Sequence, residues 1–165
     1  MTNPSLMIRQ ATEADYEQLC DLFAELDLQH REARPDLFHK PKGPVRERGY
    51  VAGLIGGPES AIFVASERDA RVLHGLATVV TRMAPASMVK PERRIAEVDN
   101  LVVHRQARRM GIGRALIGQT RDWAERKGFG TLELAVYEFN DEAIAFYQAL
   151  GFATAQRRMA LSCAS

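Results

Sequence analysis

The sequence has little cysteine, no excess of charge and no long apolar run, and each absence excludes a class of protein. Its two cysteines, Cys20 and Cys163, lie far apart, so no disulfide framework is expected and a reduced, cytoplasmic chain is the simplest interpretation. Lysine and arginine number 22 against 21 acidic residues, which gives no overall reason to expect nucleic acid or an anionic membrane as a partner. No apolar run approaches the ~20 residues that cross a bilayer, and the opening MTNPSLMIRQ lacks the apolar core of a secretory signal.

Metal-ligand spacing and sequence repeats are also missing. The four histidines, His30, His39, His74 and His104, show no spacing typical of a metal site, and no repeat, low-complexity tract or linker interrupts the chain. What is present is an ordinary globular composition, with 46% hydrophobic and 26% charged residues. The length of 165 residues suits a single domain spanning residues 1–165.

The periodicity of apolar residues predicts strands alternating with helices. The first expected helix begins at Thr12, which forms a near capping box with Asp15. Further helices are expected near 45–57, at about 112–127 and after the capping residue Asn140. The expected strands cover 5–11, 60–67, 71–83, 95–104, 131–139 and 152–162, the second and third forming a hairpin around the turn ERDA. This order predicts an α/β sheet with helices packed on it.

The stretch RRMGIGRAL joins the strand at 95–104 to the helix at 112–127. The first N–H groups of a helix have no partner within it, and together with the helix dipole they form an anion site. Glycines let the backbone approach a ligand closely, and arginines pair with phosphate through planar guanidinium groups. The residues of these two kinds are Arg108, Arg109, Gly111, Gly113 and Arg114. They indicate either a pyrophosphate site or a tight turn with solvated arginines. The spacing is neither the dinucleotide fingerprint nor a P-loop.

A second segment, VYEFNDEAIAFYQALGF, follows in the order strand, helix and Gly-Phe. Together with EVDNLVVHRQARRMGIGRALI and the opening IRQATEADYEQL, it resembles the GNAT superfamily of N-acetyltransferases over essentially the whole chain. The family's Arg/Gln-x-x-Gly-x-Gly/Ala loop corresponds to residues 108–113. Its helix-starting Asn, its Tyr and its Gly-Phe correspond to Asn140, Tyr147 and Gly151-Phe152.

The resemblance implies a single-domain GNAT-like α/β fold with a mixed sheet of about six to seven strands and about four flanking helices. It also implies that the sheet is splayed between the strands at 95–104 and 131–139. The implied donor is acetyl-CoA, with no metal. Its pyrophosphate would lie on the glycine-containing loop, and its pantetheine arm on the backbone of the preceding strand. The expected cofactor-binding residues are Leu101, Val102, Val103, Arg108, Arg109, Met110, Gly111, Ile112, Gly113, Arg114, Asn140 and Tyr147.

Acetyl transfer to an amine needs a base, because a lysine-type amine has a pKa of about 10.4 and reacts only when neutral. Glu97 and Asp99 are two residues apart on a strand, so they share a face and can raise each other's pKa. Either carboxylate, or water, remains a candidate base. The N–H of Leu101 is the candidate donor to the oxyanion. The resemblance implies that Tyr147 is the acid that protonates the departing thiolate.

Several functional interpretations stay open. The favoured one is an N-acetyltransferase acting on a primary amine of a small molecule or peptide by direct attack on the thioester. A catalytically silent CoA-binding regulatory module is the alternative, and nucleic-acid binding through HRQARRMGIGR fits the local charge but not the near-neutral whole.

Residues 30–40 lie where the family builds its acceptor wall. A homodimer, common in the family, is possible. Cys20 is expected in the core, without a base paired to it in the sequence.

Overall fold

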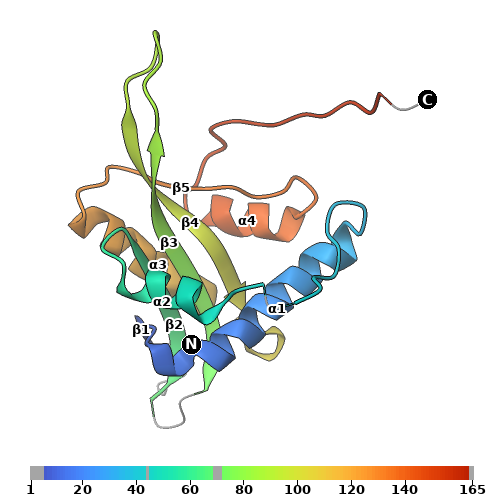
Figure 1. Cartoon of the computed structure of the whole chain (residues 1–165), viewed down its shortest axis with the longest axis vertical. Helices are drawn as coiled ribbons and strands as arrows, with labels where there is room; N and C mark the ends of the chain where they lie inside the picture. The colour runs from blue at the N-terminus through green and yellow to red at the C-terminus, as the bar shows by residue number, and fades with distance from the viewer. Residues whose placement is uncertain (1–5, 44, 69–71, 164–165) are drawn as a thin grey trace. The chain divides into compact units, whose positions relative to one another are not determined.

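The structure is a computed structural model that describes residues 6–43, 45–68 and 72–163. The chain forms two compact units, Met1–Ala135 and Val136–Ser165. The first unit contains β1 Leu6–Gln10, α1 Tyr16–Ala33, α2 Arg48–Gly56, β2 Ser60–Glu67, β3 Leu73–Ala84, β4 Arg93–Val103, α3 Ile112–Arg126 and β5 Leu132–Leu134 (Figure 1). It also has two short 3-10 turns, η1 Glu13–Asp15 and η2 Arg105–Ala107, while the second unit contains α4, Asp141–Ala149.

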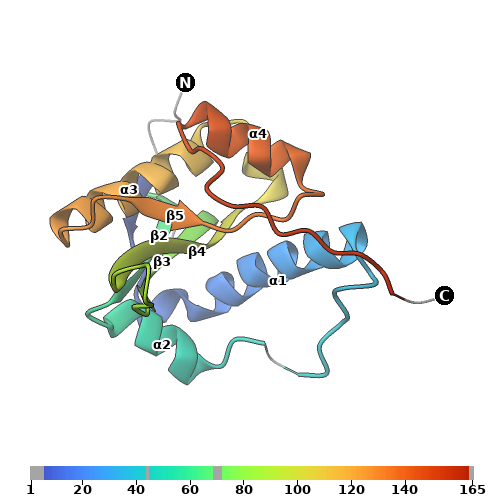
Figure 2. The same ribbon diagram turned by 90° about the horizontal axis from the view of Figure 1, so that it is seen from above.

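The five strands form one mixed sheet in the order β1-β2-β3-β4-β5. All neighbouring pairs are antiparallel except β4 and β5, which are parallel. Helices α1 and α2 cover one face of the sheet and α3 covers the other (Figure 2). Side chains alternate along β2 accordingly, since Ile62 and Val64 pack under α1 and α2 while Phe63 packs under α3. The predicted α/β fold is therefore confirmed.

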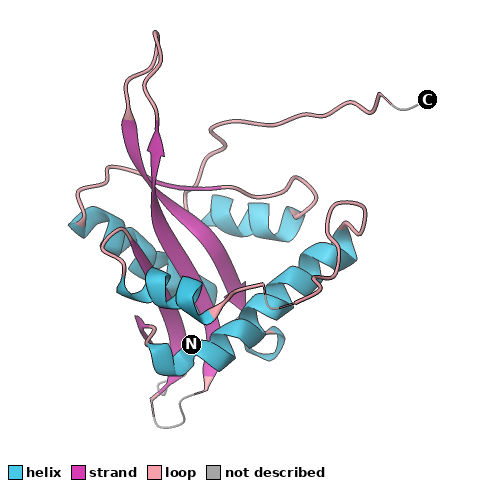
Figure 3. Cartoon of the chain, in the orientation of Figure 1, coloured by secondary structure: helices cyan, strands magenta, loops and turns pink. Residues whose placement is uncertain are grey.

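The predicted strand count was too high, because one expected strand is missing, and another is shorter than expected. The strand expected at 131–139 is only Leu132–Leu134, and residues 152–162 form no strand (Figure 3). The apolar residues that suggested the last strand, Met159 and Leu161, are 86% and 89% exposed. A strand without a paired neighbour is not stabilised, so alternation alone was insufficient. The first residue expected in β1, Ser5, and residues 69–71 beside the predicted hairpin turn lie outside the described residues.

The start of α1 is fixed by Asp15, as the near capping box suggested. The Asp15 carboxylate accepts the backbone N–H of Thr12 at 2.8 Å, although η1 intervenes before α1 begins. The Arg9 guanidinium on β1 donates to both oxygens of Asp15, at 2.7 and 2.8 Å, and lowers the pKa of that carboxyl. This pair ties the beginning of α1 to the edge of the sheet.

Gly75 on β3 sets how closely α3 approaches the sheet. A Cβ at this position would lie 2.8 Å from the carbonyl oxygen of Val102 and 3.3 Å from side-chain atoms of Ile112 and Leu116. We expect Gly75→Ala to lower the free energy of unfolding by about 1–3 kcal/mol, because the methyl group overpacks this contact. Urea denaturation measures the change. The control is Gly118→Ala in α3, where a Cβ meets nothing within 4 Å and the change should stabilise by up to about 1 kcal/mol. Equal effects of the two substitutions would contradict the close approach.

Candidate functional site

A bulge in β4 lies at the point where β4 separates from β5. The register of the β3–β4 ladder shifts between Val98 and Asn100, so Asp99 is an extra residue in β4. The parallel β4–β5 ladder ends at the pair Val98 and Leu134. Beyond this pair, β4 has no strand partner on its outer edge within the described residues. The outer edge of β4 is therefore open beyond Val98, because β5 ends at Leu134, and the splay expected between the two strands stays a prediction.

The open edge of β4 presents backbone groups of the residues predicted there. The N–H of His104 donates to the carbonyl oxygen of His74 on β3 at 2.8 Å. Backbone groups alternate sides along a strand, so Leu101 and Val103 direct theirs away from β3, toward the open edge. The backbone of Val102 instead faces β3, and its side chain packs into the layer under α1. The Leu101 N–H can thus donate to a ligand along this edge.

The loop after β4 leaves the N-terminus of α3 available to an anion. Gly111 is the N-cap of α3 and is left-handed, with φ 80°. The first intrahelical bond runs from Ala115 N–H to Gly111 O at 3.0 Å. The N–H groups of Ile112, Gly113 and Arg114 therefore have no partner within the helix. The dipole of this 15-residue helix adds positive potential at the same end. This geometry, beside the open edge of β4, fits a long ligand that carries phosphate.

The loop itself has an unusual backbone. Arg109 has φ 63° and is the non-glycine residue with positive φ among the described residues, a conformation that is energetically unfavourable for most side chains. The Arg108 Nε donates to the carbonyl oxygen of Val103 at 3.2 Å. Met110 packs against the core under α3. Of the three arginines predicted to meet phosphate, Arg109 and Arg114 are exposed, whereas Arg108 already binds the protein backbone.

The two predicted carboxylates share one arginine. The Nε of Arg82 on β3 donates to Glu97 at 2.8 Å, and its Nη2 donates to Asp99 at 2.7 Å. The hydrogen bond that Arg82 donates to Glu97 raises the pKa of Arg82. The carboxylates therefore lie together, as predicted, but a cation between them opposes the mutual repulsion on which the sequence argument rested. The amide of Asn100 donates to Asp99 and to Thr78 Oγ1, both at 3.0 Å. Sequence reasoning identified neither Arg82 nor Asn100.

The second unit contains the other two predicted site residues, Asn140 and Tyr147. The Asn140 side chain accepts the N–H of Ala143 at 3.1 Å and caps α4, as predicted. The Tyr147 ring packs edge-on against Phe146 and Phe152, with centroid separations of 5.3 and 5.7 Å. Burial raises the pKa of Tyr147 to about 12. The phenol therefore keeps its proton throughout the physiological pH range.

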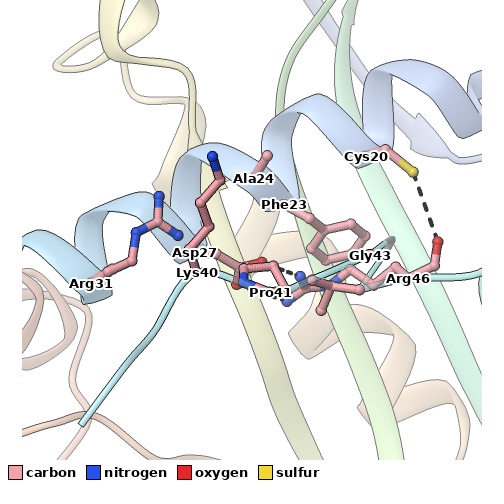
Figure 4. A pocket seen from close by; sticks show the side chains of 10 residues that line it. Cys20, Phe23, Ala24, Asp27, Arg31, Lys40, Pro41, Gly43 and Arg46 are labelled. Atoms are coloured by element: carbon pink, nitrogen blue, oxygen red, sulfur yellow. Dashed lines mark hydrogen bonds and ion pairs between the residues drawn. The ribbon is translucent and has the colours of Figure 1, made fainter. Parts of the chain in front are cut away.

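A cavity of about 390 Å³ lies between α1 and the loop that follows it. Asp27 forms an ion pair with Arg46, whose Nη2 lies 3.1 Å from Asp27 Oδ1 and whose guanidinium stacks 4.4 Å from the centroid of the Phe23 ring. The Cys20 thiol faces the carbonyl oxygen of Arg46 (Figure 4), so Cys20 lines this cavity and is only partly buried, contrary to the expected core position. The lining residues are Cys20, Phe23, Ala24, Asp27, Arg31, Lys40, Pro41, Gly43, Val45 and Arg46.

Neither a metal-binding cluster nor a membrane-crossing helix is present in the described part of the chain. No cluster of three or more His, Cys, Asp or Glu side chains there is arranged to hold a metal ion. Among the same residues, no helix has the length and apolarity that crossing a membrane requires.

Comparisons with known proteins agree on one family. The model of the acetyltransferase (GNAT) family matches residues 16–152. The ribosomal protein bS18-alanine N-acetyltransferase of Escherichia coli K12 is 35% identical over 95 residues, which cover 58% of this chain and 64% of that protein. A mutant of the BH1408 protein of Bacillus halodurans has a TM-score of 0.87 at 25% identity, covering 96% of this chain and 99% of that one. The aminoglycoside enzyme AAC(6')-Iy, solved with a bisubstrate analogue of CoA and acetylneamine, has a TM-score of 0.73 at 19% identity, covering 97% and 99%. This last likeness shows the fold alone.

Proposed function

This chain belongs to the acetyltransferase (GNAT) family, and we propose that it transfers the acetyl group of acetyl-CoA to a primary amine by direct attack on the thioester. The observation that carries the proposal is the open edge of β4, which leads through a glycine loop to the free N-terminus of α3. A ligand with an amide-containing arm and a pyrophosphate matches these two features, since amides pair with a strand edge and phosphate binds a helix N-terminus.

The residues that would hold acetyl-CoA lie on two neighbouring segments. The backbone of Leu101 and Val103 would pair with the pantetheine arm. The N–H groups of Ile112, Gly113 and Arg114 would bind the pyrophosphate, with the Arg114 guanidinium beside it. The donor itself supplies a thioester carbon that is open to attack by nitrogen. The family resemblance adds Asn140 and Tyr147 to the proposed set.

The proposed chemistry removes protons from the incoming amine and supplies one to the departing sulfur. Asp99 or Glu97, directly or through water, accepts the proton of the incoming ammonium, so that a neutral nitrogen forms the C–N bond. The Leu101 N–H donates to the carbonyl oxygen as negative charge grows there. As the C–S bond breaks, Tyr147 donates its proton to sulfur, and the positively charged nitrogen loses its second proton, which returns to the Tyr147 oxygen directly or through water. The products are the acetylated amine and free coenzyme A, with one proton released overall.

We assign the acceptor to the cavity between α1 and the following loop. Two residues that line this cavity, Arg31 and Lys40, lie within residues 30–40, the segment that the sequence predicts to face the acceptor. The floor is apolar at Phe23, and the rim carries both signs of charge, with Asp27 beside Arg46. The Escherichia coli relative is named as a ribosomal protein bS18-alanine N-acetyltransferase, and AAC(6')-Iy was solved with a bisubstrate analogue that joins CoA to acetylneamine. A primary amine is the chemistry these acceptors share.

The proposal is tested by release of free thiol from acetyl-CoA with a panel of amines. The panel contains a peptide with N-terminal alanine, a lysine peptide, an aminoglycoside and a polyamine, and mass spectrometry identifies the acetylated product. We expect at least one amine to raise thiol release above the rate without amine. Coenzyme A binding without any transfer would favour the silent regulatory module. Salt-dependent nucleic-acid binding without coenzyme A affinity would favour the third interpretation. A cytoplasmic location and a homodimer stay predictions.

A further inference from the structure

Glu25 of α1 lies against the turn that leads from β4 into the phosphate loop. Its carboxylate accepts the backbone N–H of Arg105, the first residue of η2, at 2.9 Å. The Glu25 side chain is only 17% exposed. A hydrogen bond from a backbone N–H to a partly buried carboxylate is stronger than one between neutral groups. Glu25 therefore fixes the chain where it leaves the sheet.

Two side chains from the same segment approach the Glu25 carboxylate. The Nη2 of Arg108 lies 3.7 Å from one oxygen, and the Nε2 of His104 lies 3.8 Å from the other. The Nε of Arg108 also donates to the carbonyl oxygen of Val103 at 3.2 Å. The guanidinium of Arg108 is thus held between α1 and the end of β4, and it links the helix to both sides of the turn.

We propose that Glu25 is a positioning residue for the loop that binds the coenzyme A pyrophosphate. The inference rests on the proposed function. Between η2 and α3 the chain passes through two left-handed residues, Arg109 and Gly111, and unfavourable backbone of this kind persists only where its surroundings fix it. Glu25 fixes the start of this segment, and Ile112, which is 3% exposed, fixes its end. Without Glu25 the start is released, and the N–H groups of α3 face the ligand through a less ordered loop.

These contacts also assign a role to Arg108. Its guanidinium contacts Val103 and Glu25 and so holds the loop in place, instead of binding the phosphates directly. Arg114, which is exposed at the first turn of α3, remains placed to meet them. The motif position that suggested a phosphate ligand in the sequence is therefore a second positioning residue.

Calorimetric titration of coenzyme A into the wild-type chain and two Glu25 variants tests the inference. Glu25→Ala removes every contact and should weaken coenzyme A binding about tenfold, the equivalent of one hydrogen bond to a charged group. Glu25→Gln keeps an oxygen for the Arg105 N–H but loses the charge, so we expect a loss of about threefold. The matched control is Glu17→Gln on the same helix, whose carboxylate is 80% exposed and pairs with Arg48 at 2.9 Å. The control should bind coenzyme A like the wild type.

A second readout separates positioning from loss of folding. Once an acceptor is known, both variants should raise the KM for acetyl-CoA and leave kcat at saturating donor unchanged. Wild-type affinity, within twofold, in both Glu25 variants would overturn the inference and leave the proposed function standing. If Glu25→Ala does not fold, the isosteric Glu25→Gln decides alone. A wild-type chain without affinity for coenzyme A would overturn the proposed function and the role of Glu25 with it.

Discussion

Gly111→Val is expected to weaken coenzyme A binding by about 10- to 100-fold while the fold stays intact. Gly111 is left-handed, with φ 80°, and valine disfavours this region strongly because it is branched at Cβ. The new side chain would also stand at the N-cap, in front of the N–H groups of Ile112 and Gly113. Both effects act at the proposed pyrophosphate site. Calorimetric titration with coenzyme A measures the loss.

The chain offers a matched control for this substitution. Gly128, just past the other end of α3, is also left-handed, with φ 83°, and a Cβ there would meet nothing within 4 Å. Gly128→Val introduces the same kind of backbone strain far along the helix from the loop. We therefore expect a comparable loss of stability in thermal denaturation but unchanged coenzyme A affinity. If Gly111→Val also kept its affinity, the loop would be only a turn.

The parts of the site that rest on local signals could be predicted from the sequence. Gly111 and Gly128 bracket α3, and Asn140 caps α4, because such positions depend on the conformation of a few neighbouring residues. The start of α3 after the glycine-containing loop belongs to this class, since a glycine turn before an amphipathic helix indicates where that helix begins. Strand periodicity predicted that Glu97 and Asp99 share a face. Both carboxylates do bind Arg82, although a bulge at Asp99 interrupts the β3–β4 ladder.

The partners of these residues could not be predicted, because they come from other elements. Arg82 meets Glu97 and Asp99 only through the β3–β4 pairing, and nothing in the local sequence specifies that register. Glu25 is 80 residues from Arg105 in the chain, so no pattern around either position connects them. The missing last strand has the same cause, since strand formation depends on a partner as much as on alternation.

The shared arginine changes what is expected of the base. A carboxylate that holds the Arg82 guanidinium is less available to an incoming ammonium, and two carboxylates with one guanidinium leave a net charge of about −1 at pH 7. In the proposed reaction, the incoming ammonium would therefore have to replace Arg82 at whichever carboxylate accepts its proton.

Tyr147→Phe is expected to leave acetyl-CoA affinity almost unchanged and to lower kcat. The variant removes one hydroxyl but keeps the ring that packs against Phe146 and Phe152, and a proton donor to sulfur matters mainly as charge develops in the transition state. A positioned acid contributes about 10²–10⁴ in rate. We expect a value near the lower end, because a phenol whose pKa is raised to about 12 by burial gives its proton uphill to a thiolate with a pKa of about 8.5.

The pH dependence and a control variant complete this test. Because the pKa of Tyr147 is raised to about 12, the acid form is essentially fully present below about pH 10, and kcat of the wild type should show no loss from its ionisation up to that pH. Tyr137→Phe is the matched control, since Tyr137 lies in the same unit and is 48% exposed, and its kcat should equal that of the wild type. kcat is measured with a saturating acceptor, and acetyl-CoA affinity separately. A Tyr147→Phe variant within twofold of the wild-type kcat, with chemistry rate-limiting, would make Tyr147 a packing residue and leave water or the substrate to protonate the sulfur.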